Sequence, residues 1–189
     1  EVMAHLSELN ESRRALEHLA RHDTLTGLPN RRMFFDRLEH AIASSRRNDQ
    51  QLAVLFVDLD RFKEINDTLG HAVGDGVLMN VAIQLKSAVR EVDTVARLGG
   101  DEFVILLEKI ADPQHVTAIV RKLHDLFQHA MQIGGHELLV HASMGVSIFP
   151  RDGKDADELI QNADQAMYNS KKEGRNTFSF HSANPEGTG

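Results

Sequence analysis

The segment RLGGDEFVILL, residues 97–107, constrains this chain more than any other. Two adjacent glycines and two adjacent carboxylates separate two apolar runs, 94–98 and 103–107. Because glycine adopts positive φ angles at little cost, this pattern predicts a tight hairpin of two strands. Asp101 and Glu102 would then lie at its tip or at the start of the second strand. Taken alone, the same residues are equally typical of a polar turn that closes a core hairpin.

The composition predicts one compact domain with short appendages for these 189 residues. The absence of cysteine excludes disulfides, thiolate metal sites and a cysteine nucleophile. A net charge of -7 argues against a general nucleic-acid binder, so an anionic ligand would need a few placed cations or metal ions. No apolar run reaches membrane-spanning length and no signal peptide is visible. The start at Glu1 rather than Met indicates a fragment, which leaves open a membrane anchor elsewhere in a longer protein.

The first 20 residues carry apolar side chains at alternating spacings of four and three, with Arg13 at one of these positions. The pattern is typical of a dimerising coiled coil, in which Arg13 would set the register at a cost in stability. A helix packed on its own domain would carry the same pattern. We therefore divide the chain into an N-terminal helix (1–20), a main domain (21–181) and a disordered tail (182–189).

Apolar periodicity predicts alternating helices and strands in the main domain. A strand buried on both faces is expected over 52–57, where six apolar residues run without interruption up to Asp58. A loop is expected over 44–51, and 61–68 is expected as a short polar segment anchored by Phe62 and Ile65, with no helix assigned to it. Glycines are expected to loosen the turn after residue 69. The other expected elements are helices after Asn30 and at 77–89, 113–127 and 157–172, and strands at 131–133, 138–140, 143–149 and 177–180.

This order of elements predicts an α/β fold, with a mixed sheet covered by helices. Asp58 closes one central strand and Asp101 opens another, so the two carboxylates could meet on neighbouring strands. Such a pair suits a two-metal phosphoryl-transfer site, in which acidic ligands bridge ions roughly 3.5–4 Å apart. Hard oxygen ligands favour Mg²⁺ or Mn²⁺ over zinc.

Five motifs together give the chain a specific resemblance. They are DTLTGLPNRR at 23–32, FVDLDRFKEIND at 56–67, HAVGD at 71–75, RLGGDEF at 97–103 and SKKEGRN at 170–176. In this order and spacing the chain resembles the GGDEF diguanylate cyclases over about residues 21–180. The resemblance implies condensation of two GTP molecules into cyclic di-GMP, with release of pyrophosphate. It also implies an α+β sandwich with a mainly antiparallel sheet, similar to the palm of polymerases and nucleotidyl cyclases.

The resemblance implies roles for the acidic residues. Asp58 and Asp101 match the carboxylate ligands of two Mg²⁺ or Mn²⁺ ions per active site, with the backbone carbonyl of Leu59 assisting. The metals would activate the 3′-hydroxyl of one GTP and steady the α-phosphate of the other. Asp101 would help to remove the hydroxyl proton, and Glu102 would support the site.

The resemblance also implies the substrate contacts. Asn66 and Asp75 match the residues that read the guanine edge, and an acidic acceptor favours guanine over adenine. Lys171 and Arg175 are four residues apart, which predicts that they share a face at a helix end. The remaining matched positions are Leu25 and Leu78 as walls of the base pocket, and Lys63 with the backbone at Phe62 as contacts of the triphosphate.

Arg90 and Asp93 match the family's RxxD inhibitory site, where the product binds and holds domains in an unproductive arrangement. A guanidinium suits bidentate recognition of phosphate or of a guanine edge. An exposed ion pair would have the same sequence, because RxxD is a short motif.

The implied partners are GTP, cyclic di-GMP, a second copy of the chain for activity, and an upstream sensor joined through the N-terminal helix. Neither nucleic acid nor a membrane contact of this fragment is expected, and the implied location is the bacterial cytoplasm. Two other classes of function compete with an active cyclase. One is a catalytically silent domain that binds GTP or cyclic di-GMP and regulates a neighbour. The other is a dimerisation element, which leaves Asp58, Asn66, Asp75 and Asp101 unexplained.

Overall fold

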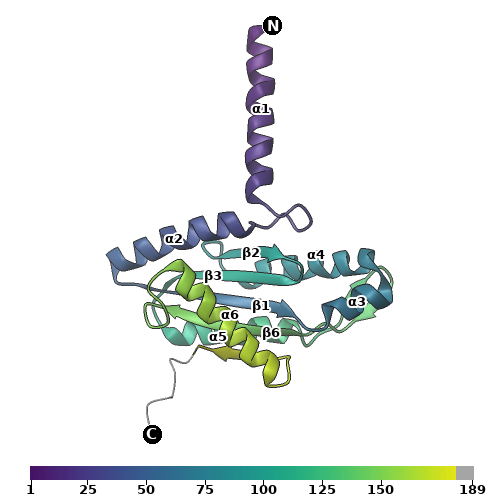
Figure 1. Cartoon of the computed structure of the whole chain (residues 1–189), viewed down its shortest axis with the longest axis vertical. Helices are drawn as coiled ribbons and strands as arrows, with labels where there is room; N and C mark the ends of the chain where they lie inside the picture. Colours follow the sequence, from purple (N-terminus) through teal and green to yellow (C-terminus); the bar gives the residue numbers. More distant parts are fainter. Residues whose placement is uncertain (182–189) are drawn as a thin grey trace.

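The computed structural model describes residues 1–181 and is built around strand β1, Gln51–Leu59. This strand lies in the middle of a five-stranded sheet with the order β2-β3-β1-β6-β7 (Figure 1). Only the β6–β7 pair is parallel, so the expectation of a mixed, mainly antiparallel sheet is confirmed. The other strands are β2 (Thr94–Gly99), β3 (Glu102–Ile110), β6 (Ala142–Phe149) and β7 (Phe178–Phe180).

Helices cover both faces of this sheet, as the apolar run of β1 requires. Odd-numbered β1 side chains pack against α4 (His71–Ala88) and α5 (Pro113–Leu126). Even-numbered β1 side chains pack against α2 (Arg31–Asn48) and α6 (Ala156–Lys172). The alternation follows from the two-residue period of a strand, and it gives the domain two hydrophobic cores.

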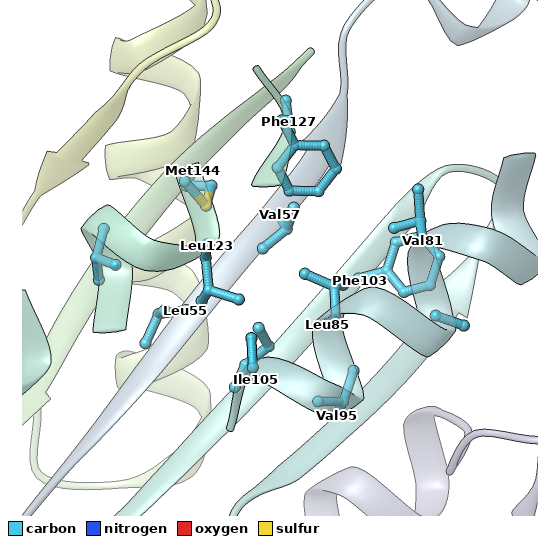
Figure 2. Close-up of a cluster of buried hydrophobic side chains, with 14 of the residues drawn as sticks. Leu55, Val57, Val81, Leu85, Val95, Phe103, Ile105, Leu123, Phe127 and Met144 are labelled. Carbon is cyan, nitrogen blue, oxygen red and sulfur yellow. The ribbon is translucent and has the colours of Figure 1, made fainter. Parts of the chain in front are cut away.

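Figure 2 shows the core between the sheet and helices α4 and α5. Leu55 and Val57 of β1 point toward Leu85 of α4 and Leu123 of α5, and Phe103 of β3 is fully buried beside them. Burial of side chains of this size contributes about 1.5–3 kcal/mol each. This core therefore reaches along β1 and β3 up to the strand ends that carry the acidic residues.

Smaller elements surround this core. Helix α3 (Phe62–Leu69) follows β1 directly, and a separate two-stranded hairpin is formed by β4 (Met131–Ile133) and β5 (His136–Leu138). Helix α1 (Val2–Arg21) has no buried residue and projects away from the domain (Figure 1). Within residues 1–181 no helix is both long and apolar enough to span a membrane.

Three boundaries expected from the sequence are wrong. Residues 44–48 continue α2, because Ser45 is buried on its inner face and the helix ends at Asp49 in a left-handed conformation. Residues 61–68 are mostly helical, as α3. The second strand of the 131–138 hairpin starts immediately after its two glycines, so it covers His136–Leu138 rather than 138–140.

Gly74 and Gly76 lie inside α4 and do not loosen a turn before it. A Cβ on Gly74 would lie 1.8 Å from Oδ1 of Asn66, so this glycine lets α3 and α4 approach closely. Helix α4 begins six residues before the helix expected at 77–89, and β3 runs three residues beyond the apolar run 103–107. The remaining expected elements agree with the structure to within two residues at their ends. The predicted disordered tail, 182–189, lies outside the described residues.

Gly145 of β6 supports the packing of α6. A Cβ there would lie 2.1 Å from the carbonyl oxygen of Ala163 and from the nitrogen of Met167, both backbone atoms of α6. We expect Gly145→Ala to reduce the free energy of unfolding by about 3 kcal/mol, because a rigid helix backbone must move. Gly76→Ala is the control, since its added methyl would lie 2.6 Å from Cγ2 of the Ile133 side chain rather than against backbone, and about 1 kcal/mol of helix propensity offsets part of that clash, so we expect a smaller loss. Denaturant unfolding measures both, and equal losses would contradict this account of the β6–α6 contact.

Candidate active site

The register of β1 and β3 gathers three carboxylates at one end of the sheet. Asp58 lies opposite Glu102, and the Leu59 N–H donates to the Asp101 carbonyl oxygen at 3.3 Å. Gly99 and Gly100 have φ angles of 146° and 50°, values that permit the tight turn between β2 and β3. The predicted hairpin is therefore confirmed, and the turn brings Asp101 beside the end of β1.

Asp58 is a buried carboxylate with one ion-pair partner. Its Oδ2 atom accepts from Nζ of Lys171 on α6 at 2.8 Å. Its Oδ1 atom is buried and has no hydrogen-bond partner among the described residues. Burial raises the pKa of Asp58 to about 7, and the charge of Asp101 adds to this effect while Lys171 opposes it. The site thus holds one oxygen poised to accept a positive ligand.

Glu102 projects toward the same helix, because residues opposite each other on paired strands face the same side of a sheet. Its pKa is raised by burial and then by the charges of Asp164 on α6 and of Asp101. Arg31 and Lys171 oppose this shift. An excess of negative charge at one sheet end favours the binding of cations there.

The Gly-Gly turn is anchored by Arg97, a residue that sequence reasoning missed. Its guanidinium donates to the Gly100 carbonyl oxygen at 2.8 and 3.0 Å, and pairs with Asp23 at 2.8 Å. Asp23 also accepts from the backbone and hydroxyl of Thr26. The arginine therefore ties the hairpin turn to the DTLTG loop; both residues belong to recognised motifs, but neither motif alone shows this contact.

The candidate guanine contacts lie between α3 and α4. The Asn66 side chain covers Gly74, and Asp75 is the next residue of α4. Leu78, one turn later, is buried, and Leu25 packs against the same core while half-buried. The structure therefore brings these candidate residues together on the side of the sheet that α4 covers.

The candidate phosphate contacts are more dispersed. Lys63 is exposed on the first turn of α3, after the buried Phe62, whereas Lys171 is paired with Asp58. Arg175 does not share a helix face with Lys171, because α6 ends at Lys172 and Arg175 has a left-handed φ of 66°. Arg175 instead lines a cavity of about 540 Å³ beside α3, together with Arg61.

Arg90 and Asp93 form a second, separate arrangement at the start of β2. The Asp93 side chain is fully buried, so the pair is not an exposed ion pair. Its Oδ2 accepts from the Arg90 backbone and Nε, and its Oδ1 accepts from Arg90 Nη2 and from the Glu108 N–H. Asp93 thereby holds the half-exposed Arg90 guanidinium beside a cavity of about 550 Å³, which Arg37 and Lys86 also line.

Comparison with known proteins identifies the family to which this chain belongs. The family model described as "Diguanylate cyclase, GGDEF domain" matches residues 20–177. The chain is 46% identical over 174 residues to the bifunctional diguanylate cyclase/cyclic di-GMP phosphodiesterase MucR of Pseudomonas aeruginosa. This match covers 92% of the chain but 25% of MucR, so the chain spans about a quarter of that relative. The chain belongs to the GGDEF domain family.

Solved structures show the same architecture. The GGDEF domain of YfiN (TpbB) from Pseudomonas aeruginosa superposes with a TM-score of 0.82 at 39% identity, covering 84% of this chain and 99% of that one. The coiled coil and GGDEF domain of DgcB from Caulobacter crescentus, solved in complex with c-di-GMP, gives a TM-score of 0.82 at 25% identity and covers 95% of each chain. The fold expected from the resemblance is confirmed.

The raised pKa of Asp58 predicts a pH-dependent stability of the metal-free protein. Between the unfolded pKa near 3.8 and the folded pKa of about 7, the unfolded chain releases the proton first, so this carboxyl lowers stability as the pH rises. Asp58→Asn removes that effect. We expect thermal melts in EDTA to show the variant more stable than the parent at pH 8, with a smaller difference at pH 4.5.

Asp36→Asn is the matched control for this experiment, because Asp36 forms an exposed ion pair with Arg21 on α1. Its melts should show no comparable gain on going from pH 4.5 to pH 8. A stability difference between Asp58→Asn and the parent that is constant over this range would contradict the assigned environment of Asp58.

Proposed function

We propose that this chain is a diguanylate cyclase that joins two GTP molecules into cyclic di-GMP. In each half-reaction the 3′-oxygen of one GTP attacks the α-phosphorus of the other, and pyrophosphate leaves. Two phosphodiester bonds form and two pyrophosphates are released. The observation that carries the proposal is the buried, unpartnered Oδ1 of Asp58 next to the Asp101 turn, in a chain of the GGDEF family.

The donor set fits a divalent metal. Asp58, Asp101 and the Leu59 carbonyl offer hard oxygen atoms. This set contains only two side chains, and no larger group of His, Cys, Asp or Glu side chains suited to a metal occurs among residues 1–181. Mg²⁺ is commonly held by one or two carboxylates plus substrate phosphates, which matches so small a set. Two bound Mg²⁺ or Mn²⁺ ions would supply Lewis-acid stabilisation of the attacking and leaving oxygens.

The protein's own groups handle protons and charge. Asp101 accepts the proton of the 3′-hydroxyl, and Glu102 adds negative charge that keeps the cations in place. Lys171 neutralises Asp58 in the free protein and contacts the triphosphate when substrate binds. Lys63, Arg175 and the backbone at Phe62 complete the phosphate contacts, which rely on charge-assisted hydrogen bonds.

Guanine is selected between α3 and α4. The Asp75 carboxylate accepts from N1–H and the 2-amino group of guanine, and Asn66 pairs with the rest of that edge. Adenine lacks both donors and would leave the carboxylate of the exposed Asp75 without these partners, so it would bind less tightly. Leu25 and Leu78 form the apolar walls.

Each chain provides one such set of residues and therefore binds one GTP, so synthesis requires two chains. The exposed apolar residues of α1 support pairing of two copies, because Leu6, Leu9 and Leu16 are each more than half exposed in the single chain. An upstream sensor would act through this helix by changing how the two domains meet.

The first test is the rate of pyrophosphate release from GTP and Mg²⁺ across a range of protein concentrations, with the product identified by mass. We expect a rate that rises more steeply than first order in protein, and cyclic di-GMP as the product. Asp101→Ala should reduce turnover to background while leaving the melting temperature near that of the parent. GTP binding without release at any concentration would instead favour a silent receptor domain, and an active Asp101→Ala variant would exclude this metal-site assignment.

The cavity beside Arg90 is proposed to bind the product and inhibit synthesis, because three cationic residues, Arg37, Lys86 and Arg90, line it. We expect Arg90→Ala to keep the initial rate and to raise the cyclic di-GMP concentration needed for half-inhibition by at least about tenfold, equivalent to 1.4 kcal/mol. Arg151→Ala is the matched control, since Arg151 also pairs with a buried aspartate, Asp152. Unchanged inhibition of the Arg90 variant would refute the assignment of this cavity.

A further inference from the structure

Left-handed backbone conformations concentrate around one cavity beside the candidate active site. Among residues 1–181, five residues other than glycine have φ between +48° and +66°. Three of them, Arg61, Arg175 and Asn176, line the cavity of about 540 Å³ next to α3. Such conformations disfavour L-residues and persist only where the surrounding structure enforces them, typically at functional sites.

Asp60 enforces the conformation of the turn after α6. It follows β1, is only 9% exposed, and uses both of its oxygens. Oδ1 accepts from the Ser143 hydroxyl at 2.7 Å, and Oδ2 accepts from the Asn176 N–H at 2.9 Å. One buried carboxylate thus joins the end of β1, the start of β6 and the left-handed turn.

Helix α5 and the turn that follows it hold the Asn176 turn from the other side. The amide groups of Gln128 and Asn176 exchange two hydrogen bonds, at 2.7 and 3.1 Å. His124 contacts the Asn176 carbonyl oxygen at 2.9 Å and packs edge-on against Phe178. The backbone N–H and carbonyl oxygen of Asn176 and both polar atoms of its side chain therefore each make at least one hydrogen bond within the protein.

We infer that Asp60, Asn176 and Gln128 are positioning residues that fix Arg175 for the triphosphate of GTP. The inference rests on the proposed function, in which Arg175 contacts phosphate. Arg175 immediately precedes the clamped Asn176 and follows Gly174, so its backbone cannot relax without breaking the Asp60 and Gln128 contacts. A fixed backbone sets the point and direction from which the exposed Arg175 side chain leaves the turn, so less conformational entropy is lost when its guanidinium binds phosphate.

A purely stabilising role does not account for this arrangement. Left-handed Arg175 destabilises the folded chain, and glycine there would form the same turn without strain, as Gly174 does before it, whereas asparagine, as at Asn176, tolerates this conformation better. The hydrogen bonds from His124, Gln128 and Asp60 hold the turn and offset the strain at Arg175, whose side chain lies on the cavity wall. Preorganisation of Arg175 for phosphate binding explains why the chain keeps this strained turn.

The test compares affinity for the α,β-methylene analogue of GTP with affinity for guanosine, which lacks phosphates, by calorimetry. We expect Arg175→Ala to weaken analogue binding about tenfold and Gln128→Ala to weaken it about threefold or more, with guanosine binding unchanged in both. Gln128→Ala added to Arg175→Ala should cause no further loss, because the glutamine acts through the arginine. Gln84→Ala is the matched control: Gln84 donates to Asn80 on α4, far from the turn, and its loss should leave both affinities unchanged.

The possible outcomes separate the two proposals. Parental affinity in Arg175→Ala would show that the phosphate contact is wrong, and the positioning inference would fall with it. A weakened Arg175→Ala beside an unaffected Gln128→Ala would keep the phosphate contact and overturn the positioning role alone. Equal weakening of guanosine and analogue binding in Gln128→Ala would identify a general structural defect and would also overturn it.

Discussion

The antiparallel pairing of β1 with β3 is the constraint on which the candidate site depends. It sets Asp58 opposite Glu102 and directs both side chains to the α6 side of the sheet, where Lys171 lies. Because the side-chain period of a strand is two, a shift of β1 by one residue would turn Asp58 into the core beneath α4 and α5. Burying the Asp58 carboxylate in that core would be costly, and this cost opposes the shift, so register and the position of the acidic residues are coupled.

The candidate site also contains the energetically unfavourable features of this fold. Asp58 is buried with a raised pKa and one unpartnered oxygen, and Glu102 is crowded by other carboxylates. Three of the left-handed residues that are not glycine lie around the neighbouring cavity. Substitutions that relieve such features commonly raise stability and reduce activity. Unfavourable burial, like-charge contact and strain at one end of an otherwise well-packed sheet therefore have a common explanation in ligand binding.

Local patterns in the sequence predict the parts of this protein that depend on local physics. The hairpin at 97–107 is predictable because paired glycines between apolar runs leave few alternatives, and the meeting of Asp58 and Asp101 follows from strands that end beside each other. The sequence predicts that Gly74 loosens a turn, but this glycine lies in a helix and leaves room for the Asn66 side chain of another helix. The spacing of Lys171 and Arg175 predicts a shared helix face, but this prediction is wrong because the helix ends between them, before Gly174.

Contacts between distant segments account for what sequence reasoning missed. Asp60 is visible in the sequence only as a second acidic residue after a strand, but its partners, Ser143 and Asn176, are 83 and 116 residues away. Arg97 looks like part of a strand, and its contact with Asp23 spans 74 residues. No periodicity or spacing encodes such pairs, since they arise only after the sheet has formed. The positioning of a site is thus less visible in sequence than its chemistry.

The contact between Arg97 and Asp23 also connects the end of α1 to the turn that carries Asp101 through only a few residues. The carbonyl oxygens of Ala20 and Arg21, at the end of α1, accept from the side chain and backbone of Asn30, which closes the loop containing Asp23. Asp23 binds Arg97, and Arg97 binds the Gly100 carbonyl in the turn before Asp101. A helix with no buried residue is therefore joined to the acidic turn by one loop and one ion pair. In the two-chain reaction that we propose, α1 would both pair the chains and connect, through these contacts, to the carboxylates of the acidic turn.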